Sequence, residues 1–161
     1  MKRKNVLYLI LLCAISVTIF AGWAVVSNTG NSLQMELNRD GTSQKTLEIT
    51  ESDFVPGEER TYELKLVGGE GAYDFTLSFR QKESGTLQNY LYVTVKAGDV
   101  QQKKSLRGLL AGETLRFRSD ADVLVLTYSM PKEVGNEAQG AVASFDLTIT
   151  AARGAGDEAD A

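Results

Sequence analysis

The feature that most constrains this chain is a two-residue alternation of apolar and polar side chains. It is cleanest in the run 72–80, which reads Ala-Tyr-Asp-Phe-Thr-Leu-Ser-Phe-Arg. Successive side chains of a β-strand point to opposite faces of a sheet, so this pattern predicts a strand with one buried and one solvated face. The large apolar residues are predicted to be central core. They are Tyr73, Phe75, Leu77 and Phe79.

Similar short runs recur along most of the chain, separated by turn-forming residues about every ten positions. The further predicted strands are 33–37, 46–50, 60–67, 90–95, 100–105, 114–118, 123–130 and 141–151. The segment 105–112 is too short and too rich in glycine for a stable helix, so a helical turn or loop that packs Leu106, Leu109 and Leu110 is expected there. The predicted fold class is all-β, with two antiparallel sheets packed face to face.

Three connections carry specific expectations. The glycine-rich stretch Gly68-Gly-Glu-Gly71 is predicted to be a hairpin connection, since no helix follows it that could make it a phosphate-binding loop. The runs 123–130 and 141–151 are interpreted as two long, hairpin-like strands joined by the polar loop 131–140. Lys103 and Lys104 favour an edge position for 100–105, because charged side chains discourage pairing with another strand.

The N-terminus has the pattern of an export signal. Lys2-Arg3-Lys4 precedes an apolar run from Val6 to Val26, as in a secretory signal peptide, and the same run is long enough to span a membrane. The predicted organisation is a signal peptide or membrane anchor at 1–26, a linker at 27–32, a β-sandwich domain at 33–151 and a disordered acidic tail at 152–161. We therefore expect a secreted or cell-surface protein, membrane-anchored if the N-terminal segment is retained. Its expected partners in export are signal peptidase and the membrane.

Composition bears on which partners and chemistry to expect. Removing the three N-terminal bases from the 17 basic residues leaves 14 against 21 acidic ones, a formal charge of −7 for the exported part, so no nucleic-acid partner is expected. The chain has no histidine, and its one cysteine, Cys13, lies in the apolar N-terminal run. The commonest general base, zinc ligand and thiol nucleophile are thus missing from the domain, so neither an enzyme nor a cofactor or metal is predicted.

Two weaker readings stay open beside that one. The acidic groups Asp120-Ala-Asp122 and Glu48, Glu51, Asp53 could bind calcium, although acids at strand ends are more often simply solvated. The second concerns three tyrosines that could form an exposed aromatic face but are equally ordinary residues of a core or sheet surface. They are Tyr90, Tyr92 and Tyr128.

Several short motifs resemble the TasA/camelysin family of exported bacterial biofilm-matrix proteins. They are Tyr128-Ser-Met-Pro131, Val134-Gly-Asn136, Ala138-Gln-Gly140 and the final strand to Ala151, with Phe54-Val-Pro-Gly57 and Leu87-Gln-Asn-Tyr-Leu-Tyr-Val-Thr-Val95 upstream. The similarity covers about 33–151. It implies a jelly-roll-like β-sandwich and assembly into surface fibres, in which an N-terminal strand of one subunit completes a sheet of the next.

The leading hypothesis is therefore an extracellular fibre subunit that associates with itself or with other matrix subunits. The candidate interface residues are Leu33, Met35 and Leu37 in the first predicted strand, with Leu47 and Ile49 in the second as an alternative. In the loop 131–140, Asn136 and Gln139 either complete a turn or contact a neighbouring subunit. The alternative function is a membrane-anchored cell-surface binding or adhesion module that does not polymerise.

Overall fold

The computed structural model describes residues 33–38 and 41–154. Most of these residues lie in nine strands, with one short helix and two 3₁₀ turns between them. The strands are β1 (Leu33–Glu36), β2 (Thr42–Ser52), β3 (Glu59–Val67), β4 (Tyr73–Glu83), β5 (Tyr92–Ala97), β6 (Val100–Ser105), β7 (Leu115–Ser119), β8 (Val123–Ser129) and β9 (Val142–Arg153). The helix is α2 (Leu106–Leu110), and the 3₁₀ turns are η1 (Leu87–Asn89) and η2 (Asn136–Ala138).

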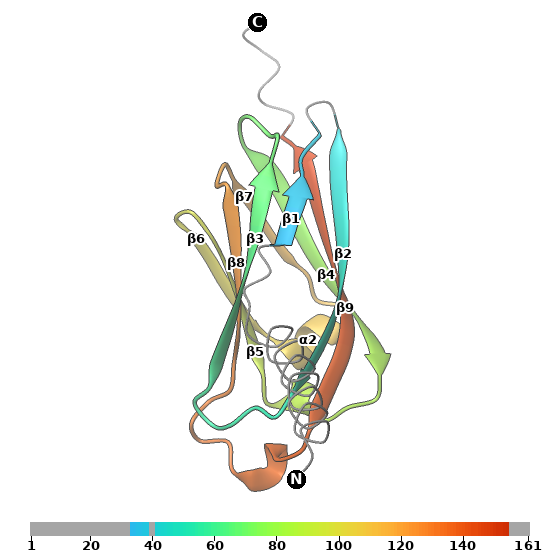
Figure 1. The fold of residues 1–161 in the computed structure, drawn as a ribbon, viewed down its shortest axis with the longest axis vertical. Coiled ribbons are helices and arrows are strands. Elements are labelled where there is room, and N and C mark those ends of the chain that lie inside the picture. The colour runs from blue at the N-terminus through green and yellow to red at the C-terminus, as the bar shows by residue number, and fades with distance from the viewer. Residues whose placement is uncertain (1–32, 39–40, 155–161) are drawn as a thin grey trace, which may run out of the picture. The chain divides into compact units, whose positions relative to one another are not determined.

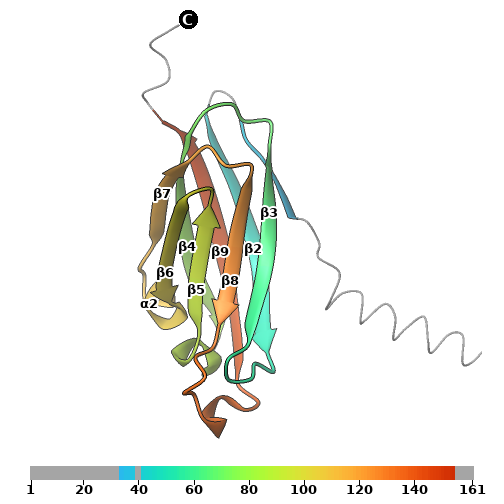
Figure 2. The ribbon, with the colours of Figure 1, turned by 90° about the vertical axis from the view of Figure 1, so that its left-hand side faces the viewer.

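The described strands form two sheets that face one another, so the predicted all-β sandwich is confirmed (Figures 1 and 2). One sheet has the order β2-β9-β4-β7, and the other has β1-β3-β8-β5-β6. Leaving β1 aside, the eight remaining strands have the order 2-9-4-7 and 3-8-5-6, in which the first strand pairs with the last. This winding is that of a jelly roll. β1 is thus an added strand on an otherwise complete eight-stranded fold.

The core lies between the two sheets and is built by the alternation seen in the sequence. β4 shows it most clearly, because Tyr73, Phe75, Leu77 and Phe79 are all buried while their neighbours face solvent or are half-buried. The opposite sheet supplies Leu124, Leu126 and Tyr128 from β8. The short helix α2 closes one end with Leu106 and Leu109, which are fully buried, as predicted for this segment.

β1 differs from every other described strand in its pairing. It runs parallel to β3, with Leu33 opposite Leu64 and Glu36 opposite Val67, whereas all other strand pairs are antiparallel. Figure 1 shows β1 beside the upper half of β3, across from the β2 edge of the other sheet. Only four of the nine positions of β3 are covered by β1.

Two predicted connections are wrong. β3 and β4 lie in different sheets, so Gly68–Gly71 does not close a hairpin but carries the chain from one sheet to the other. The same holds for β8 and β9, whose connecting loop 131–140 also crosses between sheets. Both loops have the polar, glycine-containing composition of hairpin turns. They differ from hairpin turns only because the strands on either side pair with distant strands in different sheets. β6 is an edge strand, as its lysines predicted.

Several predicted boundaries shift. β2 begins at Thr42, four residues earlier than expected, and β9 continues to Arg153, so residues 152 and 153 belong to the sandwich and not to a tail. The segments predicted at 1–26 and 27–32, and the predicted tail from 155 onward, lie outside the described residues. Within the part of the chain that is described, no helix is long and apolar enough to cross a membrane.

Candidate functional site

The candidate site is the half of β3 that β1 leaves uncovered. β1 pairs with Leu64–Val67, and no described strand lies beside Glu59–Glu63 on that side. On the other side, Met130 N donates to Glu58 O and Leu66 N to Asp122 O, so the even-numbered residues of β3 bond towards β8. Backbone groups alternate along a strand, hence the N–H and C=O groups of Glu59 and Thr61 and the N–H of Glu63 point to the uncovered side, while the C=O of Glu63 faces the start of β1.

The inner face behind this backbone is apolar and incompletely covered. Leu47 and Ile49 lie opposite the buried Leu147 and Phe145 of β9, so they face the interior, yet both are only half-buried. Tyr62 of β3 is in phase with the buried Leu64 and remains 39% exposed. We call the backbone of Glu59–Glu63 together with Leu47, Ile49 and Tyr62 the open edge. It combines backbone groups that pair with no described strand and apolar surface, the two features that bind an extended segment.

A network of polar side chains closes one end of the open edge. Glu51, at the end of β2, is 1% exposed, and its two carboxylate oxygens have different partners across the gap between the sheets. Arg60 Nη1 lies 3.1 Å from Oε2, and the Tyr62 hydroxyl donates to Oε1 at 2.8 Å. A buried carboxylate is tolerated when it is paired and hydrogen-bonded in this way. The network therefore ties β2 to β3 where β1 does not reach.

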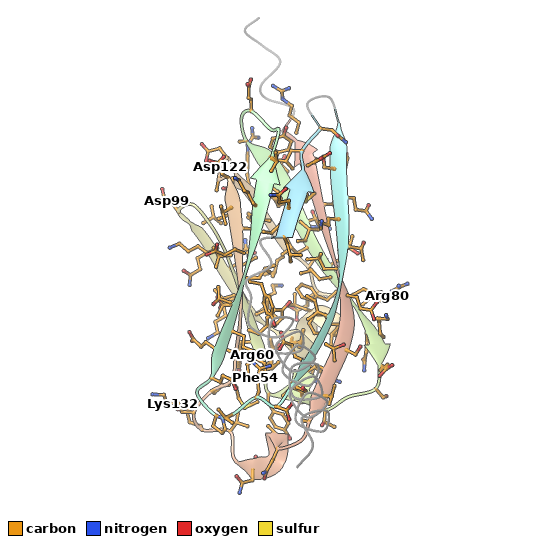
Figure 3. The ribbon with its side chains drawn as sticks, in the orientation of Figure 1. Phe54, Arg60, Arg80, Asp99, Asp122 and Lys132 are labelled. Atoms are coloured by element: carbon orange, nitrogen blue, oxygen red, sulfur yellow. The ribbon has the colours of Figure 1, made fainter. Side chains whose placement is uncertain are left out.

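Arg60 also holds the turn between these two strands. Its guanidinium donates to the backbone oxygens of Ser52 and Asp53 at 2.9 and 3.2 Å, and its Nε lies 2.7 Å from Glu58 Oε1. Its Cζ lies 4.1 Å from the centre of the Phe54 ring, which is cation–π geometry. Figure 3 shows Arg60 and Phe54 together at the lower end of the space between β3 and β2.

Burial changes the acid–base properties of the network. Desolvation raises the pKa of Glu51, although the hydrogen bond from Tyr62 and the charge of Arg60 oppose it. Desolvation and the charge of Glu51 raise the pKa of Tyr62 to about 12. For Glu58, burial alone would raise the pKa, but hydrogen bonds from Arg60 and from the Val55 N–H lower it overall. Glu51 is thus the group of this network whose charge costs most to bury.

Tyr128 lies behind the network and has an unusual hydroxyl. The ring packs edge-on against Tyr62, with 5.8 Å between centroids, and lies tilted against Phe145, with 5.9 Å between centroids. The side chain is completely buried, and its hydroxyl makes no hydrogen bond with any described residue. Burial therefore raises the pKa of Tyr128 well above its usual value. An unpaired buried hydroxyl normally costs stability, so this group marks imperfect packing next to the open edge.

β1 sits beside the open edge and is held by few contacts. Met35 is 2% exposed and Leu37 is 8% exposed, and Lys45 Nζ donates to Gln34 O from the facing β2. Burying two such side chains contributes about 1.5–3 kcal/mol each. Fixing the backbone costs about 1–2 kcal/mol per residue. Over a four-residue strand these opposing terms are similar in size, so β1 is held only weakly.

The opposite side of the sandwich is protected in a different way. There the edge strands are β6 and β7, which carry four basic residues: Lys103, Lys104, Arg116 and Arg118. Gln102 also donates to the outward carbonyl oxygen of Arg116 at 2.7 Å. Like charges and capped backbone groups discourage the addition of another strand. The β6 and β7 edges are therefore poor sites for the addition of another strand.

The structure brings the predicted interface residues together in part. Leu33, Met35 and Leu37 lie on or just after β1, and Leu47 and Ile49 lie on β2, which faces β1 across the gap between the sheets. In the loop 131–140, Gln139 N donates to Asn136 O at 3.0 Å, so the backbone of these residues completes a turn. Both side chains are exposed, and a contact with a neighbouring subunit remains a prediction.

Other candidates do not come together as predicted groups. Among the described residues, no three His, Cys, Asp or Glu side chains are placed to hold a metal ion, and Glu51 is engaged by Arg60 and Tyr62. Tyr90, Tyr92 and Tyr128 do not form one face, because Tyr128 is buried in the core and Tyr92 is exposed. The Glu51–Arg60–Tyr62 network was not predicted from the sequence. The sequence did hold one indication of it. Glu51 lies an even number of residues from Leu47, and Arg60 an even number from Leu64, so each charged side chain falls on the same face of its strand as an apolar one.

By fold and site, the chain is a jelly-roll β-sandwich with an added strand, β1, that leaves half of β3 without a described neighbour on that side. No family model and no curated protein matches it.

Solved structures with some similarity include the full extracellular region of zebrafish Gpr126/Adgrg6, at 14% identity and a TM-score of 0.41 over 78% of this chain. A second is the CUB1-EGF-CUB2 domains of rat MASP-1, at 19% identity and a TM-score of 0.38 over 73% of this chain. A third is PliG of Aeromonas hydrophila, a periplasmic inhibitor of g-type lysozyme, at 12% identity and a TM-score of 0.34 over 74% of this chain. The matched region spans 15%, 42% and 96% of those chains, respectively.

Proposed function

We propose that this chain is an exported structural protein, a subunit of an extracellular biofilm-matrix fibre that assembles by β-strand addition. The observation that carries the proposal is the open edge, where no described strand pairs with the backbone of Glu59–Glu63 beside half-buried Leu47 and Ile49. A strand from a second copy can bond to those groups and cover that surface. The signal-like N-terminus and the motifs shared with TasA/camelysin proteins support export and a matrix role. In this proposal the role is structural and not catalytic.

Asymmetry between the two sides of the sandwich favours a fibre over a closed dimer. The open edge is acidic, with Glu59 and Glu63 on its outer face, whereas the opposite edges β6 and β7 are basic. A contact in which one subunit donates and the next accepts is head-to-tail, and such contacts generate open filaments unless the rotation closes a ring. A self-complementary two-fold contact would instead place like charges together.

The test compares assembly of two variants that gain the same charge in β1. Met35→Glu places a carboxylate at a buried position of β1, and the matched control Gln34→Glu places one on the exposed face of the same strand. Both are expressed from the full chain, and the recovered protein is followed by sedimentation velocity and electron microscopy over a concentration series. We expect fibres from the parent and Gln34→Glu and none from Met35→Glu.

The proposal fails if the parent remains monomeric at every concentration and pH. Mass spectrometry of the same preparations reads the N-terminus. A monomer that retains residues 1–26 in the membrane fraction would instead identify the alternative function, an anchored surface module that does not polymerise.

A further inference from the structure

We propose that a hollow on the outer face of the sheet β1-β3-β8-β5-β6 binds a carboxylate-bearing sugar, one residue of an acidic polysaccharide. The hollow has a volume of about 230 Å³ and lies where β3 begins and β8 ends. Sites for drug-sized ligands have volumes of roughly 300–1,000 Å³, so this hollow suits a single ring with its substituents. The proposal goes beyond fibre assembly, because its ligand is a saccharide and not a protein strand.

Three neighbouring strands place the polar residues of the hollow on one face. Glu59 of β3 and Tyr92 of β5 both lie opposite Ser129 of β8, one on each side of it. Successive side chains of a strand point to opposite faces, and Tyr128, the residue before Ser129, is buried in the core. The row formed by Glu59, Ser129 and Tyr92 therefore faces away from the core.

Two lysines that line the hollow form no ion pair with any described residue. Lys103 Nζ lies 5.0 Å from the centre of the Tyr92 ring, which is cation–π geometry. The stem of Lys132 lies along Gly57, where an added Cβ would be 2.9 Å from its Cγ and 3.3 Å from its Cε. Figure 3 shows Lys132 near the lower end of the sandwich. Local packing thus positions both ammonium groups and leaves them available to an anion.

The hydroxyl of Ser129 is a second, independent indication of a ligand. Ser129 lines the hollow and is only 9% exposed, yet its hydroxyl makes no hydrogen bond with any described residue. Polar groups enclosed to this extent normally have a partner. A hydroxyl can both donate and accept, so a molecule in the hollow can supply the missing hydrogen bond.

The charges of the hollow favour one carboxylate on each ligand residue. Lys103 and Lys132 contribute two positive charges and Glu59 one negative charge. A uronic acid carries a single carboxylate, which can pair with the ammonium groups, and several hydroxyls, one of which can donate to Glu59. A chain with a negative charge at every position, such as a nucleic acid or an acidic peptide, would be repelled by Glu59.

Apolar surface beside these charges favours a sugar over a free anion. Met130 and Pro131 form part of the lining. Tyr92, whose ring contacts Lys103, is 39% exposed next to the hollow. A sugar ring can pack its C–H groups against such surface while its polar groups meet the lysines, whereas inorganic phosphate has no apolar part to bury.

Calorimetric titration with a short oligogalacturonate tests the site on protein expressed from the full chain. The matched probe is the methyl ester of the same oligomer, which keeps the rings and hydroxyls but has no charge. We expect the acid to bind and the ester to bind about tenfold more weakly or less, because a charge-assisted hydrogen bond is lost. Raising the salt concentration should weaken binding of the acid.

Three variants assign the binding to the hollow. Lys103→Gln and Lys132→Gln should each raise the Kd of the acid about tenfold, since each removes one ammonium group. The matched control is Lys96→Gln, which removes an exposed lysine of β5 that does not line the hollow and should leave the Kd unchanged.

Ser129→Ala separates binding from folding. It should raise the Kd about two- to tenfold, because the hydroxyl bonds only to the ligand. The midpoint of thermal unfolding should not fall, because that hydroxyl has no partner among the described residues.

The proposal is overturned if neither oligogalacturonate nor an oligomer of mannuronate binds, or if acid and ester bind equally. Tighter binding of oligoglutamate or of inorganic phosphate would overturn the sugar and identify an acidic peptide or a simple anion instead. A loss in Lys96→Gln equal to that in Lys103→Gln would show attraction to the whole face and not to the hollow. None of these measurements requires assembly, so the site and the fibre can fail independently.

Discussion

At the scale of single residues, the two tyrosines beside the open edge are predicted to behave oppositely. Tyr62→Phe removes the hydroxyl that donates to the buried Glu51 at 2.8 Å, whereas Tyr128→Phe removes a hydroxyl with no partner among the described residues. Leaving a buried acceptor unsatisfied costs about 1–3 kcal/mol, so Tyr62→Phe should lower the free energy of unfolding by about that amount. Tyr128→Phe should leave it unchanged or raise it. Urea unfolding measures both, and equal losses would contradict the described network.

Glu51 makes a second residue-level prediction, for pH. Its folded-state pKa is raised above the ordinary value of 4.5, chiefly by burial. The stability linked to such a group is present below the unfolded-state pKa and is lost as pH rises through the higher folded-state pKa. Between about pH 4 and 7, the free energy of unfolding of the parent should therefore fall relative to that of Glu51→Gln, which does not titrate. Glu58 and the other carboxylates, present in both proteins, cancel in this difference. Urea unfolding of the two proteins at several pH values measures this difference. If the difference in free energy of unfolding between parent and Glu51→Gln stays constant across this range, the raised pKa of Glu51 is contradicted.

At the scale of elements, the connection from β4 to η1 depends on a close approach to β9. Gly85 lies so near the first residue of β9 that an added Cβ would fall on the backbone carbonyl oxygen of Val142. Gly85→Ala should therefore cost about 1–3 kcal/mol, as overpacking does. Gly41→Ala is the matched control, because nothing lies within 4 Å of its added Cβ. Thermal unfolding of the two variants should separate them, and equal midpoints would contradict this packing.

Elements are also where sequence reasoning succeeded and failed. Alternation predicted the strands, including the buried face of β4, because it depends only on neighbours in the chain. The sheet to which each strand belongs could not be predicted, because Gly68–Gly71 and the loop 131–140 have the composition of hairpin turns although they cross between sheets. The same alternation predicted that Leu47 and Ile49 share one face of their strand. The pairing of Glu51 with Arg60 depends on β2 and β3 facing each other, which no local pattern records.

At the scale of the whole molecule, the sandwich has two unlike sides. β6 and β7 carry Lys103, Lys104, Arg116 and Arg118 along one side, and the open edge lies on the other. A protein that only needed to stay monomeric would be expected to protect both sides. In the proposed function, copies associate through the uncovered backbone of β3.

The most direct test removes one N–H group from that backbone. The N–H of Thr61 points to the open edge and not to β8, so Thr61→Pro blocks strand addition while it spares the β3–β8 ladder. Thr127→Ala is the control. Like Thr61→Pro, it removes the hydrogen bond between the Thr61 and Thr127 hydroxyls, which are 3.1 Å apart, but it leaves the backbone of the open edge unchanged.

Sedimentation velocity measures the assembly state of each variant, expressed from the full chain. Circular dichroism verifies that each variant is folded. The account predicts that Thr127→Ala assembles as the parent does and that Thr61→Pro stays a folded monomer. Assembly of Thr61→Pro to the same extent as the parent would contradict it.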